Sequence, residues 1–133
     1  MATKHERPPR TVIFHSAFAG IPAGSKVFIA SPSVVAKAMW GIPYGETRTT
    51  TRIRLDLARR RQCDATCPAS FAIFARIAAQ QAIDAMRAGA SPEEVAPFWR
   101  MLTGSDTVAR KLDLEDGWID ARRAQEAEGP CAR

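Results

Sequence analysis

The stretch CDATCPASFAIFARIAAQQAIDAMRAG, residues 63–89, carries the longest helical pattern in the chain. Pro68 suits a first helical turn, because its missing backbone N–H is not needed there. We expect the helix to begin near Pro68, to be capped by Thr66 or Asp64, and to end at Gly89, which tolerates a left-handed backbone. Apolar side chains recur at spacings of three and four, which predicts a buried helical face made of Phe71, Ile73, Phe74, Ile77, Ala78, Ala82, Ile83 and Met86.

Length and composition predict one folded domain that needs no disulfide or metal for its stability. The chain has 133 residues, of which 46% are hydrophobic. Its net charge of +5 and pI of about 9.6 favour anionic partners. We find neither an apolar run of about 18 residues nor a signal-peptide core, so we expect a cytoplasmic protein with no membrane association. Three cysteines, an odd number, predict reduced thiols.

The chain divides into an arm, a domain and a tail. Residues 1–20 mix charge with prolines and predict a mobile N-terminal arm, although the apolar part of this segment, residues 11–18, also fits a strand. We assign residues 21–129 to the folded domain and residues 130–133 to a tail. At the start of the domain, residues 26–30 predict a short strand.

Two helices are predicted between this strand and Pro68. Ser31 and Pro32 form a helix start, with the helix continuing to Trp40. Thr49 or Thr50 caps the next helix, which runs to about Arg61 and carries Arg52, Arg54, Arg59 and Arg60. Followed by the Pro68 helix, it predicts a helix-turn-helix, in which the Pro68 helix reads DNA. A solubilising helix face explains the same arginines, and charge alone does not choose between the two interpretations.

The C-terminal third is predicted to combine a β element with a last helix. Residues 91–94 have the form of a capping box. Residues 96–102 predict a buried extended segment, and residues 108–112 predict the other arm of a hairpin. Residues 117–128 fit a surface helix. The predicted fold class is therefore mainly α with a short β element.

Three short motifs together resemble a known family. Ile42-Pro43-Tyr44-Gly45, followed by Thr49, is similar to the start of the helix-turn-helix in the DNA-binding domain of the O6-alkylguanine-DNA alkyltransferases, and more closely in their alkyltransferase-like relatives. Pro97-Phe98-Trp99-Arg100-Met101 sits where that family carries Pro-Cys-His-Arg-Val. Glu128-Gly129 resembles the Glu-Gly that closes the last helix. The resemblance covers residues 26–129 and implies a winged helix-turn-helix placed against the minor groove, with a damaged base rotated into a pocket.

Two residues at the family's active-site position differ from the family pattern, and they change the function that the resemblance implies. Phe98 replaces the alkyl-accepting cysteine and Trp99 replaces its histidine, so alkyl transfer to residue 98 is excluded. Alkyltransferase-like proteins also lack that cysteine and bind damage without repairing it. The implied partners are double-stranded DNA, with alkylated guanine as the lesion, and a repair protein; no cofactor is implied.

The resemblance also assigns residues to the DNA contact and to the pocket. Arg52, Arg54, Arg59, Arg60 and Arg76 would contact phosphates or a groove, and Tyr44, Phe98, Trp99 and Arg100 would shape the pocket. Arg100 would hold a phosphate or a carboxylate, or instead tie the wing to the last helix. Thr50 replaces a tyrosine that pushes on the flipped nucleotide's phosphate, and Ala72 stands at the place of the intercalating arginine, with Arg76 one turn on.

Two other classes of function stay open. Cys67 lies just before a helix amino terminus, whose dipole favours a reactive thiolate, and Asp64 could orient it. This predicts a small enzyme or ligand-binding protein, unless Cys67 is simply packed in a turn. A protein-interaction module is the third hypothesis. Cys63 and Cys67 have C-x3-C spacing with no second ligand pair, so we expect no metal site.

Overall fold

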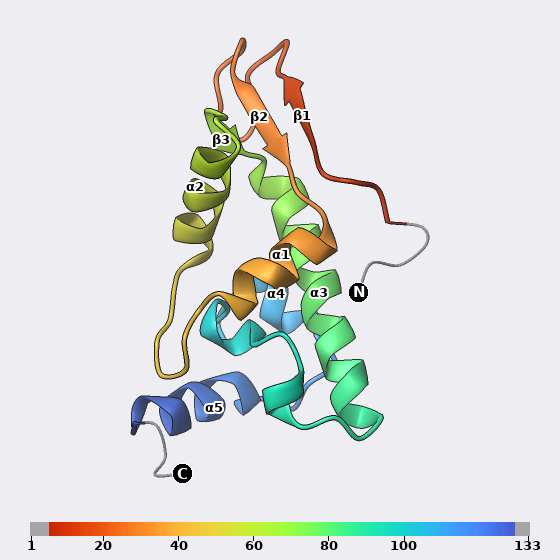
Figure 1. Cartoon of the computed structure of the whole chain (residues 1–133), viewed down its shortest axis with the longest axis vertical. Helices are drawn as coiled ribbons and strands as arrows, with labels where there is room; N and C mark the ends of the chain where they lie inside the picture. The colour runs from red at the N-terminus through yellow and green to blue at the C-terminus, as the bar shows by residue number, and fades with distance from the viewer. Residues whose placement is uncertain (1–5, 130–133) are drawn as a thin grey trace.

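The computed structural model describes residues 6–129, which form a mainly helical fold with a small sheet at one end (Figure 1). Predictions for residues 1–5 of the arm and for the tail, residues 130–133, lie outside the described residues. The elements are, in chain order, β1 Arg10–Ile13, β2 Lys26–Ile29, α1 Pro32–Trp40, α2 Thr50–Arg60, β3 Ala65–Thr66, α3 Pro68–Arg87, the 3-10 turns η1 Pro92–Glu94 and η2 Phe98–Arg100, α4 Thr107–Arg110 and α5 Trp118–Ala127.

The sheet has the order β1-β2-β3, with β1 antiparallel and β3 parallel to β2. The strand predicted at residues 26–30 is confirmed as β2. Strand β1 lies within residues 1–20, where we expected an arm, and it pairs along its whole length with β2. The folded unit therefore extends on the N-terminal side of residue 21.

Helix α1 begins and ends where the sequence predicts. The Ser31 hydroxyl accepts a hydrogen bond from the Val34 backbone N–H at 3.2 Å, and Pro32 occupies the first turn. Val35 and Met39 are fully buried one turn apart, and this face packs on α3. Local signals set both ends of α1, and the helix therefore fixes where the chain continues at Ile42.

Helix α3 spans Pro68–Arg87 as expected, and Gly89 follows it with φ of +113°. The predicted caps are wrong, because Thr66 Oγ1 donates to the Arg54 carbonyl at 2.8 Å and Asp64 Oδ2 accepts from the Lys26 N–H at 2.8 Å. Both side chains thus fasten β3 to its neighbours.

The buried face of α3 consists of Phe71, Ala75, Ala78, Ala79, Ala82 and Ile83. Its alanines let α1 and η2 approach closely, whereas Ile73, expected on this face, is 54% exposed.

The predicted hairpin of residues 96–102 and 108–112 is wrong. Residues 98–100 form η2, in which the Leu102 N–H donates to the Phe98 carbonyl at 2.8 Å, and Thr107–Arg110 forms α4. The Asp106 carboxylate accepts from the Thr103 N–H at 2.7 Å and holds the turn between them. Local hydrogen bonds thus replace the cross-strand pairing that we expected. Helix α5 follows at Trp118–Ala127, as predicted.

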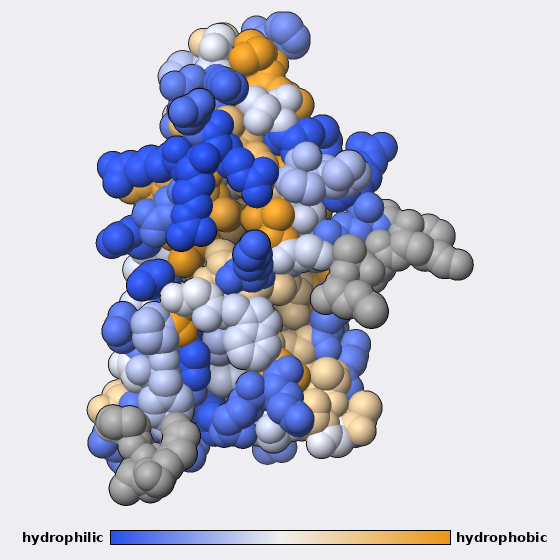
Figure 2. Space-filling view, viewed as in Figure 1, coloured by the Kyte–Doolittle hydropathy of each residue, from blue (hydrophilic) through white to orange (hydrophobic). Residues whose placement is uncertain are grey.

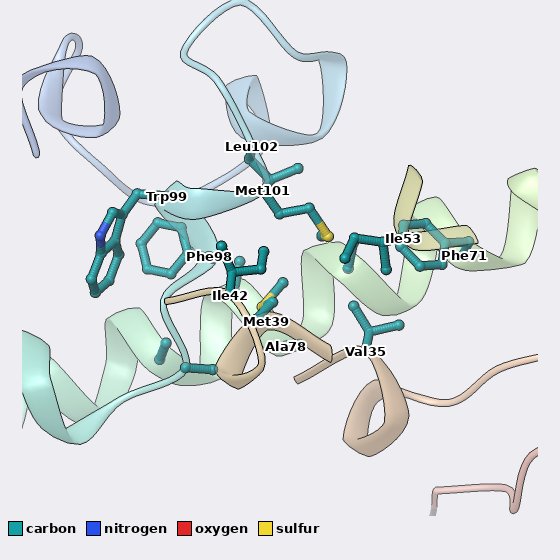
Figure 3. Packing of buried hydrophobic residues seen from close by; sticks show 14 of the residues in the cluster. Val35, Met39, Ile42, Ile53, Phe71, Ala78, Phe98, Trp99, Met101 and Leu102 are labelled. Atoms are coloured by element: carbon teal, nitrogen blue, oxygen red, sulfur yellow. The ribbon is translucent and has the colours of Figure 1, made fainter. Parts of the chain in front are cut away.

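The main core lies where α1, α3 and η2 meet (Figure 3). Figure 3 shows the side chains that converge there, namely Val35, Met39, Ile42, Ile53, Phe71, Ala78, Phe98, Trp99, Met101 and Leu102. A second, smaller cluster under the sheet contains Ile21, Val27, Ile29 and Cys67. The η2 turn, which carries three of the four predicted pocket residues, is therefore packed into the main core through Phe98 and Trp99.

Candidate functional site

The aromatic residues of η2 fill the space in which we expected a pocket. Phe98 and Trp99 have no exposed surface, and Phe98 stacks on Trp118 with ring centres 5.7 Å apart (Figure 3 shows Phe98 and Trp99 side by side in the core). Tyr44 is half-buried, and its ring lies 5.4 Å from the Arg100 guanidinium carbon. The expected pocket residues are thus brought together, but as packed core rather than as the lining of an open cavity.

A buried carboxylate, which sequence analysis missed, organises this region. Glu126 in α5 is 2% exposed and accepts from Trp99 Nε1 at 2.9 Å and from Arg100 Nε at 2.9 Å. Arg100 also donates to the Ile42 carbonyl at 2.9 Å, so it joins α5 to the segment after α1. Of the two roles open for Arg100, the structure shows the tie to the last helix. The sequence signal was present, since Glu126 lies seven residues after buried Ile119 and so shares its helical face.

The charge balance around Glu126 keeps it ionised. Burial alone raises the pKa of Glu126, but hydrogen bonds from Arg100 and Trp99, together with attraction by Arg100 and Arg122, outweigh burial and leave its pKa below the ordinary value. Arg122 Nε lies 3.5 Å from Glu126 Oε2 and is buried without a hydrogen bond. The site therefore holds one buried carboxylate against two guanidinium groups, and the exposed Glu93 carboxylate lies 3.5 Å from Arg122 Nη2 on its outer side.

Helix α2 presents the arginines predicted to contact DNA. Arg52, Arg59 and Arg60 are exposed and share a face, because they lie at positions i, i+7 and i+8 of the helix. Asp56 lies on the same face and pairs with Arg52 at 3.1 Å. Figure 2 shows hydrophilic side chains gathered where α2 lies in Figure 1. Arg54 lies on another side of α2, where its guanidinium donates to Thr51 Oγ1 at 3.2 Å.

Arg76 belongs to a different surface. It is exposed on α3 and lines a cavity of about 230 Å³ with Gln80 and Asp84. Helix α2 packs mainly against β2 and β3, whereas α3 packs mainly against α1. The structure therefore gathers four of the five predicted DNA-contact residues on one helix and places the fifth on another.

A polar cavity of about 160 Å³ adjoins the η2 turn and was not predicted. It is lined by Thr47, Arg48, Thr49, Thr50, Met101, Thr103, Asp106 and Arg123. Arg123 Nη1 donates to the carbonyls of Trp99 and Leu102 at 3.0 and 2.9 Å, which fixes one wall to η2. The Thr49 hydroxyl caps α2 by accepting from the Arg52 N–H at 3.0 Å, as predicted. Hydroxyl groups and charged side chains thus face this cavity directly beside the filled aromatic site.

The residues of the alternative reactive site do not form one. Cys67 is 6% exposed and packs with Ile21, Val27 and Ile29, so its thiol is a core side chain. The Asp64 carboxylate accepts from the Lys26 N–H and lines a separate, open cavity of about 560 Å³ beside residues 20–25. Both Cys63 and Cys67 are free thiols.

Residues 6–129 contain neither a metal-binding cluster nor a membrane-spanning helix. No group of three or more His, Cys, Asp or Glu side chains in this part of the chain is arranged to hold a metal ion. None of its helices combines the length and the apolar character that crossing a bilayer requires.

Comparisons with known proteins return nothing for this chain. No family model matches its sequence, and no match is found among curated proteins or among solved structures. The resemblance to the alkyltransferases therefore depends on the short motifs alone, and the function has to be argued from the site itself.

Proposed function

We propose that this protein binds double-stranded DNA without reacting with it, in the manner of the alkyltransferase-like proteins that its motifs resemble. The observation that carries the proposal is the exposed arginine face of α2, with Arg52, Arg59 and Arg60 directed to solvent and Asp56 as the carboxylate among them. Such a face can displace the counterions condensed on a phosphate backbone, which is the main source of affinity for DNA.

In this proposal α2 and α3 are the two helices of a helix-turn-helix. The residues between them, 61–67, contain β3 and are held to β2 through Asp64 and to α2 through Thr66, so the angle between the helices is fixed before DNA binds. The segment of residues 103–117, which includes α4, takes the place of the wing. This arrangement is supported by the order of the elements and by the exposed start of α3, where Ala69 and Ile73 face solvent.

The lesion would be bound beside η2. Because Phe98 and Trp99 fill the predicted pocket, we place the extruded base in the neighbouring cavity of about 160 Å³. Its threonine hydroxyls and Arg48 offer donors and acceptors for the edge of a base. No nucleophile replaces the missing cysteine at residue 98, so the complex would persist until a repair protein acts on it.

A binding titration tests the proposal. Fluorescence anisotropy would be measured with a duplex containing guanine and with the same duplex containing O6-methylguanine, at about 50 mM and about 200 mM salt. We expect the logarithm of the binding constant to fall with the logarithm of the salt concentration with a slope of roughly −3, as for three to four phosphate contacts. The alkylated duplex should bind more tightly at both salt concentrations. Absence of binding at the lower concentration would refute DNA binding, and equal affinities would refute lesion recognition.

A further inference from the structure

A tight turn at the sheet end of the molecule carries an exposed phenylalanine. Phe18 and Ile21 exchange backbone hydrogen bonds of 3.0 and 2.9 Å across Ala19 and Gly20. Ala19 and Gly20 have φ of +53° and +82°, as in the two-residue turns favoured in hairpins. Phe18 remains 54% exposed, although the Phe14 ring meets its edge with ring centres 6.2 Å apart. The turn thus displays an aromatic ring on a short, hydrogen-bonded support.

The backbone of this turn is strained at Ala19. A left-handed conformation brings a Cβ too close to the neighbouring carbonyl oxygen, and glycine would avoid this clash. Strain of this kind persists only where the surrounding structure enforces it, and it is found preferentially at functional positions. Here the paired backbone groups of Phe18 and Ile21 enforce it.

The turn adjoins both helices of the proposed DNA-binding unit. Ala19 and Ile21 line a cavity of about 160 Å³ together with Arg54 and Leu55 of α2 and with Pro68, the first residue of α3. In Figure 2, hydrophobic surface reaches the end of the molecule where the strands lie and borders the hydrophilic side chains over α2. The turn that carries Phe18 therefore adjoins the most basic helix of the structure through Ala19 and Ile21, at the point where α2 presents Leu55, which is 43% exposed.

Charge favours an anionic occupant for this surface, and the proposed DNA binding makes that occupant a duplex. The lining of the cavity contains one cation, Arg54, and no carboxylate. The Asp64 carboxylate belongs to the lining of the adjacent cavity, where it accepts the Lys26 N–H. An apolar tip on a turn that adjoins a basic helix fits a duplex, in which charged backbones border stacked, apolar bases.

We infer that Phe18 is a wedge that inserts between base pairs while the arginines of α2 hold the phosphate backbone. This inference rests on the proposed DNA binding and adds a residue and a mode of contact to it. Side chains of this type enter base steps from the minor groove, unstack them partly and bend the duplex. The strained, hydrogen-bonded turn orders the ring before binding, which reduces the entropy lost when the ring is inserted.

The test separates insertion from binding. A duplex with 2-aminopurine at successive positions would be titrated with wild type and with Phe18→Ala, recording anisotropy for binding and 2-aminopurine fluorescence for unstacking. We expect wild type to raise the fluorescence at one step and Phe18→Ala to abolish the rise. The variant should bind about tenfold more weakly with an unchanged salt slope, because stacking and phosphate contacts are independent terms.

Ile13→Ala is the matched control, because Ile13 is 51% exposed on β1 but lies outside the turn. It should behave like wild type. A Phe18→Ala variant with wild-type affinity and fluorescence would overturn the wedge while leaving DNA binding intact, whereas a wild type that binds no duplex would overturn both. Sedimentation equilibrium would measure whether the wild-type protein self-associates. Self-association that is lost in Phe18→Ala would show that the Phe18 ring packs against a second copy of the chain, and would also overturn the wedge.

Discussion

Trp99 and Glu126 are joined in the interior by a hydrogen bond of 2.9 Å, in which the indole Nε1–H donates to the carboxylate. The same carboxylate receives Arg100 Nε at 2.9 Å and Arg100 Nη2 at 3.2 Å. One side chain of α5 therefore satisfies both polar side chains of η2. Since a buried charge is tolerated only when it is paired and hydrogen-bonded, the position of η2 depends on Glu126.

Replacing this carboxylate by an amide should destabilise the fold. In Glu126→Gln an acceptor for Trp99 remains, but the Arg100 guanidinium, which is 15% exposed, loses its counter-charge. Arg122, which is 13% exposed, keeps the exposed Glu93 carboxylate at 3.5 Å. Breaking a buried ion pair costs roughly 3–5 kcal/mol, and partial exposure of the arginines places our expectation near 3 kcal/mol. Chemical denaturation followed by tryptophan fluorescence measures the change in the free energy of unfolding.

Glu128→Gln is the control for this measurement. Glu128 immediately follows α5 and is exposed, so the same chemical change should alter the free energy of unfolding by less than about 0.5 kcal/mol. Equal losses in the two variants would show that the network around Glu126 contributes nothing specific.

Acid should remove the contribution of Glu126. Its pKa in the folded protein lies below the ordinary value of 4.5, because hydrogen bonds from Arg100 and Trp99 and attraction by Arg100 and Arg122 outweigh burial. A carboxyl group with a lowered pKa stabilises the fold above the unfolded-state value, and this stabilisation is lost as the pH falls through the folded-state value. The stability difference between wild type and Glu126→Gln should therefore be constant near neutral pH and shrink below about pH 4.5. A difference that stays unchanged down to pH 3 would contradict this assignment.

The sequence predicted the elements whose signals are local. Ser31 with Pro32, Thr49 and Pro68 mark helix starts, and Gly89 marks a helix end, because each acts on the backbone within four residues of itself. Exposure of the α2 arginines followed from their helical spacing. These features needed no knowledge of tertiary contacts.

The sequence failed where distant segments decide the structure. The apolar run 96–102 was predicted as extended, but residues 98–100 form a tight turn instead. In this turn Trp99 and Arg100 both donate to Glu126 of α5, a residue 26 or more positions away in the sequence. The sequence alone does not show whether the aromatic pair at residues 98 and 99 lines a pocket or packs in the core. Only the Trp118 ring, brought back by α5, fills the remaining space.

The arginines of α2 should contribute to DNA affinity through charge alone. Each phosphate contact contributes about 0.9 to the salt slope, so Arg59→Ala with Arg60→Ala should reduce the slope by nearly 2 and weaken binding to guanine and O6-methylguanine duplexes equally. Arg7→Ala with Lys37→Ala removes the same charge at exposed positions outside α2, α3 and residues 103–117, and should leave the slope unchanged. Equal effects of the two double variants would mean that net charge, and not the α2 face, drives binding.

Introducing a cysteine at residue 98 should not confer alkyl transfer. Phe98 is fully buried against Trp99 and Trp118, so Phe98→Cys leaves a cavity and should cost about 2–4 kcal/mol in the free energy of unfolding. The new thiol would lie beside the Trp99 indole, whose N–H already donates to Glu126 and which cannot act as a base. Intact mass spectrometry after incubation with an O6-methylguanine duplex should show no methylation beyond that of wild type, which controls for Cys63 and Cys67. Methyl transfer to residue 98 would instead show that η2 opens in the complex and that only the nucleophile is missing, because a thiol sealed in the core cannot reach a base.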